Sequence, residues 1–296
     1  MQPNSMKKWL PAYIALGFSW GCSFILIKNS LEFLTPIGVG FFRLLLGAVT
    51  LLLWMKLRGI VLPRDRRLWG HLWVMSILLN SLPGFLFAYA QTQVSSVMAG
   101  IINASTPLMT VALVAFVLRT EKITSSEIVG VLIGFAGVLT VLGIWNGVGT
   151  GGTLAMLALL GAVLCFSFSY PYARKYLVSE GFDLSTLAAI QVLLGSLTLL
   201  PFYIVEGESI NNPTISGVLS MVLLGVLASG FAYVWNFRVM SLAGSVVASS
   251  VSYLIPLVAI LVGFVFANEK ISWNQLLGAF IILCGAAITQ KAGKSN

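Results

Sequence analysis

The chain has 296 residues, of which 58% are hydrophobic and 9% are charged, and its formal net charge is +8. A mean hydropathy of +0.97 leaves too little polar surface to cover a water-soluble globule. The composition therefore excludes a soluble globular protein and predicts an all-α integral membrane protein, because helices satisfy their own backbone hydrogen bonds in lipid.

Ten apolar segments have the length of about 20 residues that a helix needs to cross the hydrocarbon core of a bilayer. Short connections join them and leave no room for a soluble catalytic domain. Lys7 and Lys8 precede the first segment as in a signal peptide, but no cleavage site with a soluble domain follows, so we expect this helix to be retained. The predicted spans are 9–30, 36–57, 69–92, 95–118, 126–146, 152–173, 184–205, 215–240, 244–267 and 272–290.

Hydroxyl, amide and aromatic side chains recur on one face of several predicted spans. Trp20 lies too deep in the first span for the aromatic belt at the membrane interface, and its indole N–H needs a partner. Aromatic walls with a few hydroxyl and amide groups suit a small amphiphilic or zwitterionic solute, whereas the alternative for each single group is a hydrogen bond to a neighbouring helix. The candidate substrate-binding residues are Ser19, Trp20, Ser23, Asn80, Phe87, Asn103, Ser169, Tyr172, Tyr233, Asn236, Ser252 and Tyr253.

Several prolines lie inside predicted spans, where a proline beyond the first turn removes a backbone hydrogen bond and opens the helix locally. Hydrocarbon tolerates such an opening only where other parts of the protein or a water-filled cavity satisfy the freed carbonyl. We expect kinks that assist helix bending near Pro83, Pro107, Pro171 and Pro256.

Arg43 lies inside the second span, where a charge is costly unless it is paired or functional. No acidic residue lies in the middle of a predicted span to pair with it. Two roles therefore remain for this residue. The guanidinium has a structural role if it turns outward or bonds carbonyls of the first span, and otherwise it has a function in the transport path.

The two halves of the sequence repeat one plan. Residues 99–142 and 248–290 each run from a proline-broken apolar segment through Glu-Lys-Ile to an apolar segment with spaced glycines. Internal duplication of this kind is typical of membrane transporters and predicts a five-helix repeat at 1–147 and a second at 148–296, which together form one transport domain. The matched residues, 148 or 149 positions apart, are Pro107 with Pro256, Glu121 with Glu269, Gly130 with Gly278 and Gly137 with Gly285.

The basic residues predict the orientation of the spans. Most of the 17 lysines and arginines fall on one side of the membrane if the N-terminus is cytoplasmic, which predicts that both termini lie in the cytoplasm. Each repeat has an odd number of predicted spans. The second repeat must enter the membrane from the opposite side. The predicted fold is therefore ten transmembrane helices as two inverted five-helix repeats, which can open a midplane site alternately to each side.

Residues that several other functions need are missing from the predicted spans. Every Asp and Glu maps to a span end or a loop, the single histidine His71 lies at a span end, and no phosphate-binding GxxxxGK[ST] loop is present. The three cysteines lack metal-ligand spacing. We expect no metal, no cofactor and no nucleic-acid partner, and the expected partners are a small-molecule substrate and the lipid bilayer. Gly130 and Gly134 permit close helix packing, so a monomer or a weak homodimer is expected.

A set of residues follows a fixed order along the chain: Trp20-Gly21, Ser23-Phe24 and Lys28, then Pro36 and Arg43, then Asn103 to Pro107, then Glu121, Gly130 and Gly137, and finally Pro256, Glu269, Gly278 and Gly285. In their order and duplication they resemble the drug/metabolite transporter superfamily, specifically its EamA-type ten-helix exporters, along essentially the whole chain. The resemblance implies two inverted five-helix repeats and a central cavity formed mainly by the first, third, fourth, sixth, eighth and ninth helices. It also implies secondary transport of amino acids, other metabolites or toxic organic compounds.

The predicted function is that of a secondary transporter, not an enzyme, which exports small metabolites such as amino acids across the cytoplasmic membrane by alternating access. We expect a multi-pass protein of the cell inner membrane. One alternative is efflux of aromatic or cationic drugs, which the lack of a mid-span carboxylate disfavours. A lipid flippase or membrane enzyme is an alternative of a different class and would show His, Asp or Glu clustered at one interface. A passive channel is the third alternative.

Overall fold

The computed structural model describes residues 6–91, 93, 102–118, 122–146, 152–206, 213–267 and 272–292. Every candidate substrate-binding residue falls within these ranges, whereas Glu121 and Glu269, two of the matched repeat positions, lie outside them. The described residues form helices and connecting segments without a strand. The predicted all-α class is therefore confirmed for this part of the chain.

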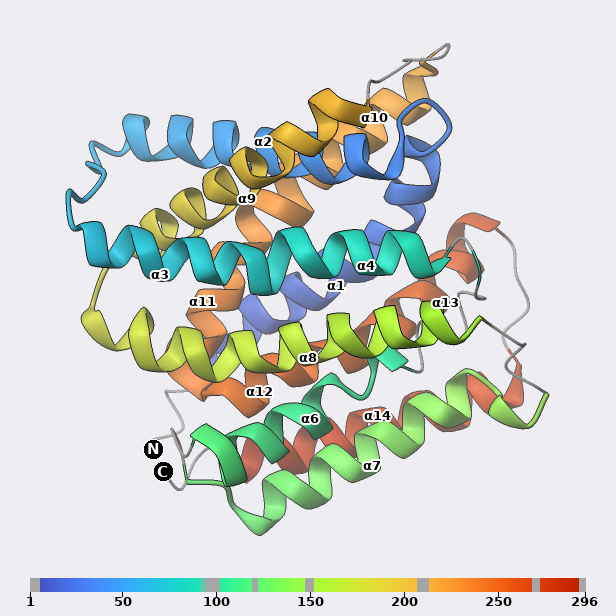
Figure 1. Cartoon of the computed structure of the whole chain (residues 1–296). Helices are drawn as coiled ribbons and strands as arrows, with labels where there is room; N and C mark the ends of the chain where they lie inside the picture. Colours follow the sequence, from blue (N-terminus) through green and yellow to red (C-terminus); the bar gives the residue numbers. More distant parts are fainter. Residues whose placement is uncertain are drawn as a thin grey trace.

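The helices of the two sequence halves lie against one another (Figure 1). The first half contributes α1 (Met6–Ser30), α2 (Pro36–Leu57), α3 (Arg66–Ser76), η1 (Ile77–Ser81), α4 (Leu82–Gln91), α6 (Thr106–Ala112), η2 (Leu113–Leu118), α7 (Ser125–Val141) and η3 (Ile144–Asn146). The second half contributes α8 (Thr153–Tyr176), η4 (Val178–Glu180), α9 (Leu184–Glu206), α10 (Ile215–Leu223), η5 (Leu224–Phe231), α11 (Ala232–Ala243), α12 (Ser245–Ser249), η6 (Ser250–Tyr253), α13 (Leu254–Ala267) and α14 (Trp273–Ala292). Helix α4 packs beside α8, α2 beside α9 and α7 beside α14, so neighbours in space come from opposite halves.

Seven helical stretches within the described residues are long and apolar enough to cross a membrane. They are Lys8–Ile27, Pro36–Leu57, Arg66–Phe87, Thr153–Glu180, Leu184–Glu206, Ile215–Ala243 and Ser245–Val262. Three further apolar helices are shorter, namely Thr106–Val117, Ser125–Val141 and Trp273–Thr289. The chain is thus a multi-pass membrane protein, and the predicted number of ten spans stays a prediction.

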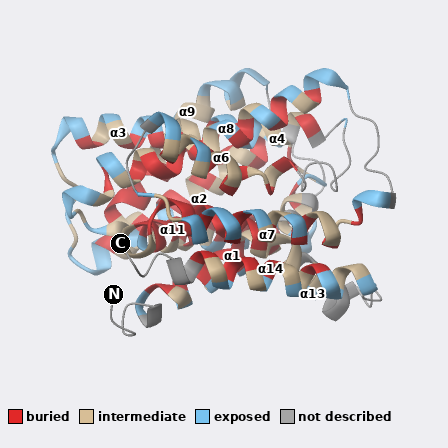
Figure 2. Ribbon diagram, turned by 90° about the horizontal axis from the view of Figure 1, so that it is seen from below, coloured by how far each residue is buried: buried red, intermediate tan, exposed pale blue. Residues whose placement is uncertain are grey.

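The distribution of polar and apolar side chains is that of a protein whose solvent is lipid. Figure 2 shows that buried residues gather where the helices meet and exposed residues lie on the outer faces. Large apolar side chains such as Leu132 and Phe280 are 52% and 65% exposed, whereas Gln191, Ser229 and Asn236 are fully buried. An apolar exterior is stable in hydrocarbon, and the polar groups must then find partners or ligands inside.

Local capping explains where several helices begin. Thr35 accepts a hydrogen bond from the Gly38 amide at 3.1 Å, and Pro36 occupies the first turn of α2, where its missing N–H costs nothing. At α7 the Thr124 hydroxyl accepts from the Glu127 amide at 3.2 Å while the Glu127 carboxylate accepts from the Thr124 amide at 2.8 Å. The acidic residue at this span end therefore serves the helix itself.

Two pairs of segments depart from α-helical geometry at matched places in the two halves, whereas a further π-helical segment, η2, has no such match in α13. Segments η1 and η5 are π-helical, the chain turns at 104–105 before α6, and η6 is a 3₁₀ segment before α13. Pro83, Pro107 and Pro256 follow η1, the turn and η6 within three residues. A proline cannot donate to the carbonyl four residues earlier, which accounts for loosened geometry at that place. Pro171 differs, because α8 continues as an α-helix through it.

Glycines let α7 and α14 meet backbone to backbone. A Cβ added to Gly137 would lie 2.7 Å from the Ile282 amide nitrogen and 3.0 Å from the Gly278 carbonyl oxygen. Gly130, one turn from the start of α7, meets Gly285 near the end of α14, so the two helices run antiparallel. The glycine face that we expected to support close packing is therefore occupied by a helix of the same chain.

We expect Gly137→Ala to destabilise the protein by about 1–3 kcal/mol, because the new methyl group meets backbone atoms that cannot turn aside. Gly70→Ala is the matched control, since an added Cβ at this helical glycine has no atom within 4 Å. Thermal unfolding in detergent measures both. Equal unfolding temperatures for the two variants would show that α7 and α14 are not in backbone contact.

Candidate functional site

Three helices meet at the π-helical segment η5. Trp20 of α1 donates its indole N–H to the Ala228 carbonyl oxygen at 3.2 Å, and its ring meets the edge of Tyr233 at a centroid distance of 6.0 Å. Arg43 of α2 donates from Nε to the Ser229 hydroxyl at 2.8 Å. We call Trp20, Arg43, Ser229 and Tyr233 the Arg43 cluster. The deep tryptophan thus has the partner that its burial requires.

Two buried polar side chains near this cluster in sequence have no partner among the described residues. They are the Ser19 hydroxyl of α1 and both amide atoms of Asn236 in α11. Helices α1 and α11 pack against each other, and Asn236 follows Tyr233 by three residues, which places it on the same helical face. An unsatisfied buried amide costs about 1–3 kcal/mol, so retaining one favours a role in binding. Ser23 instead donates to the Trp20 carbonyl oxygen at 2.6 Å.

A second polar contact joins η1 to α9. Gln191 donates from Nε2 to Asn80 Oδ1 at 3.0 Å, which leaves the Asn80 amide nitrogen and the Gln191 amide oxygen without partners among the described residues. Beside them the Ser81 hydroxyl donates to the Gly195 carbonyl oxygen at 3.2 Å. Gln191 was not among the predicted site residues. The signal was present, because it is the one carboxamide in the span 184–205 and lies 148 residues after Arg43.

The polar residues around the breaks before α6 and α13 bond mainly within the protein. The Tyr253 hydroxyl donates to the Val131 carbonyl oxygen at 2.8 Å, and a Cβ on Gly134 would lie 2.5 Å from the Tyr253 ring. Ser252 donates to the Ser249 carbonyl oxygen at 2.8 Å. The role that we considered as the alternative, bonding between helices, therefore describes Tyr253 in this structure.

The remaining candidates lie on α4, on the segment before α6 and on α8. Asn103 accepts at its backbone carbonyl from the Thr106 hydroxyl at 2.7 Å, and its side chain is half-buried. The Ser169 hydroxyl donates to the Phe166 carbonyl oxygen at 2.7 Å, and the Phe166 ring stacks on Phe87 at 5.8 Å.

Tyr172 lies at a different contact. Its hydroxyl and His71 Nδ1 are 2.7 Å apart, and the Tyr176 ring stacks on the His71 ring at 4.9 Å. This contact joins α3 to α8 near the end of α8. The structure therefore brings Tyr172 together with His71 and Tyr176.

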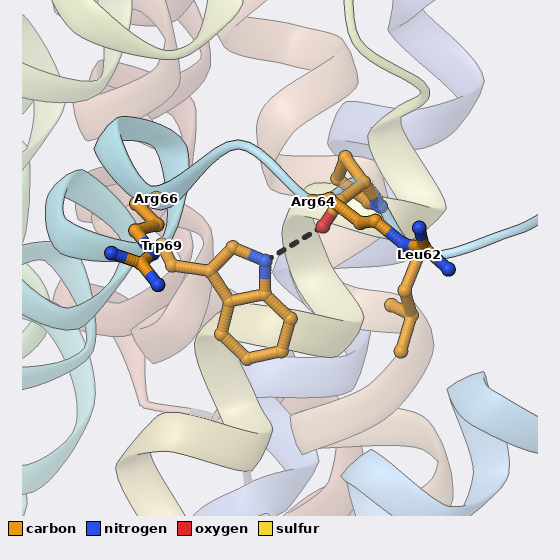
Figure 3. Close-up of a pocket in the computed structure, with 5 residues that line it drawn as sticks. Leu62, Arg64, Arg66 and Trp69 are labelled. Atoms are coloured by element: carbon orange, nitrogen blue, oxygen red, sulfur yellow. Dashed lines mark hydrogen bonds between the residues drawn. The ribbon is translucent and has the colours of Figure 1, made fainter.

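A surface hollow of about 510 Å³ lies on the connection between α2 and α3, and it contains none of the predicted site residues. Figure 3 shows the Trp69 indole on one side of this hollow and Arg64 and Leu62 on the other. Trp69 donates its N–H to the Pro63 carbonyl oxygen at 2.9 Å, which fixes the shape of the connection. Arg64 and Arg66 make the hollow basic. Within the described residues no group of three His, Cys, Asp or Glu side chains is placed to hold a metal ion.

We expect Asn236→Leu to unfold at a temperature no lower than the wild-type protein while losing transport. Leucine has a similar volume and removes two unsatisfied polar atoms, whose burial costs about 1–3 kcal/mol. Thermal unfolding in detergent and uptake into proteoliposomes measure the two effects separately. A lower unfolding temperature would mean that the amide has a structural partner.

Tyr253→Phe should behave in the opposite way, with stability lowered by about 1 kcal/mol and transport retained, because the change leaves the Val131 carbonyl without its donor. Thermal unfolding in detergent and uptake into proteoliposomes again measure the two effects separately. Loss of transport at unchanged stability would show that Tyr253 contributes to the substrate site.

Comparison with known proteins connects this arrangement to a family. The model of the EamA-like transporter family matches residues 7–143 and again residues 153–290. An uncharacterized transporter of Archaeoglobus fulgidus is 26% identical over 96% of this chain and 98% of its own length. The uncharacterized inner membrane transporter YedA of Escherichia coli strain K12 is 28% identical over 92% of this chain and 87% of its own. A crystal structure of a protein with 19% identity shares the fold with a TM-score of 0.80, over 96% of this chain and 98% of that one.

Proposed function

Because the chain belongs to the EamA-like transporter family of the drug/metabolite transporter superfamily, it is a membrane transporter, and we propose that it exports small metabolites such as amino acids by alternating access. The observation that carries the proposal is the unpartnered Asn236 amide beside the Arg43 cluster. Polar groups without internal partners, buried behind an apolar exterior and flanked by Trp20 and Tyr233, match a small zwitterionic solute.

Reciprocal contacts support the idea that the two halves are inverted repeats. Gly130 meets Gly285, and their repeat equivalents Gly278 and Gly137 meet each other in the same way. Likewise α1 packs on α11 and α13, while α8, the equivalent of α1, packs on α4 and α6, the equivalents of α11 and α13. A two-fold axis between inverted halves produces this pattern, and such halves can exchange conformations about a central site.

The matched departures from α-helix support alternating access. Segments η1 and η5 lie in equivalent helices, and the turn before α6 matches η6 before α13. Irregular backbone is tolerated at membrane depth only inside the protein or along a cavity, and π-helical segments are often found at functional sites. These four places are where we propose that the helices bend.

We further propose that the protein resides in the cytoplasmic membrane with both termini inside and acts as a monomer. One relative is named an inner membrane transporter, and the basic residues favour cytoplasmic termini. A second copy is not needed to cover the glycines of α7, because α14 already packs on them.

A thermal-shift screen of the purified protein against amino acids, other polar metabolites and aromatic cations tests the substrate class. A ligand at 100 times its dissociation constant stabilises the folded state by about 2.7 kcal/mol. We expect amino acids to raise the unfolding temperature. Stabilisation by hydrophobic cations alone would overturn the metabolite proposal in favour of drug efflux.

Counterflow in proteoliposomes tests the mechanism for any ligand found in the screen. We expect saturable uptake that is accelerated by the same solute on the opposite side, because only a carrier that alternates between two states shows this acceleration. Uptake without it would indicate a channel.

A further inference from the structure

Arg43 and Gln191 occupy equivalent positions in the two halves. They lie 148 residues apart, the separation that also relates Gly130 to Gly278. Arg43 bonds Ser229 in η5 at 2.8 Å, and Gln191 bonds Asn80 in η1 at 3.0 Å. Their partners Asn80 and Ser229 are themselves 149 residues apart. The protein therefore makes the same contact twice, once with a charged side chain and once with a neutral one.

The packing next to each contact is matched as well. Gly47 and Gly195 lie four residues after Arg43 and Gln191. A Cβ on Gly47 would lie 2.7 Å from the Ser229 carbonyl oxygen, and one on Gly195 would lie 3.4 Å from the Asn80 amide nitrogen. Both contacts thus hold a helix against a π-helical segment from the opposite half, and the neutral amide of Gln191 is sufficient for that task.

The charge of Arg43 is therefore in excess of what the contact needs. Among the described residues its guanidinium donates one hydrogen bond, from Nε to the neutral Ser229 hydroxyl, and no carboxylate forms an ion pair with it. Every acidic residue of the sequence maps to a span end or a loop, and none lies in the middle of a predicted span. A charge at membrane depth without a counter-ion is costly and points to function.

The surroundings of Arg43 suit a carboxylate. Its side chain is half-buried, and its partner Ser229 lies next to Ala228, whose carbonyl oxygen accepts from the Trp20 indole that meets Tyr233. The unpartnered groups of Ser19 and Asn236 lie on helices α1 and α11, which pack together beside η5. Guanidinium groups bind carboxylates through paired N–H donors, and additional hydroxyl and amide donors strengthen such binding.

We infer that Arg43 binds the carboxylate of the transported solute, so the substrates are small organic zwitterions or anions and not cations. This inference rests on the proposed function, because it assigns a ligand group within the same central site. The Arg43 charge is then compensated by the substrate. In the other half, Gln191 has only the structural role of holding its helix against the π-helical segment.

The test uses free amino acids and their carboxamides, which differ in the charged carboxylate. We expect the wild-type protein to prefer each acid over its amide by at least about tenfold in thermal-shift titrations. Arg43→Gln places at this position the neutral amide that Gln191 has in the other half, so the variant should fold. It should bind each acid and its amide with equal affinity, because the charge is gone. Arg43→Lys keeps the charge and should retain part of the preference. Gln191→Leu is the matched control in the other half and should leave the preference for the acid unchanged.

Several outcomes would overturn the inference. An Arg43→Gln protein that still prefers acids would show that another group binds the carboxylate. An Arg43→Gln protein that fails to fold would show that the fold itself needs the charge. Wild-type counterflow of amides and acids at equal affinity would leave the proposed transport intact and remove Arg43 from recognition. Absence of counterflow for every solute in the screen would overturn the proposed function together with the inference.

Discussion

Hydrocarbon as solvent is the constraint on which the rest of this structure depends. It allows apolar side chains such as Leu132 and Phe280 to remain outside and requires every polar group to be satisfied within the protein. The hydroxyl groups meet this requirement largely by bonding backbone carbonyls, as Tyr253 does at Val131. A few buried groups among the described residues, above all the Asn236 amide, have no such partner, and we propose that a bound solute satisfies them.

The contacts that hold the fold together join the two sequence halves. Helix α7 of the first half lies on α14 of the second through glycines, Arg43 reaches from α2 to η5, and Gln191 reaches from α9 to η1. Under the internal repeat, the Arg43 contact is equivalent to the Gln191 contact, and the contact between α7 and α14 is equivalent to itself. Both equivalent contacts are formed at the same time in this structure. We propose that the two halves exchange conformations, and equivalent contacts would then give the two states similar free energies.

Much of the fold could be predicted from the sequence, because hydropathy and the spacing of proline and glycine are local properties. The helices and the matched residues Pro107 and Pro256 follow from such patterns. The partners of individual side chains could not be predicted. Whether Tyr253 faces a cavity or the Val131 carbonyl depends on the helix that lies opposite, and the importance of Gln191 emerges only beside Asn80. The π-helical geometry of η1 and η5 was also not predicted, since the sequence indicated only a kink near Pro83.

The matched π-helical segments also record an order of events in the history of the chain. A π-helical turn closes its hydrogen bond over one more residue than an α-helical turn, so each segment corresponds to an extra residue accommodated within a helix. Segments η1 and η5 enclose the equivalent residues Asn80 and Ser229. Two independent insertions at the same place in separate halves require a coincidence that a single earlier insertion does not. If the two halves arose by duplication of a half-length chain, the simplest history is that this chain already carried the π-helical segment.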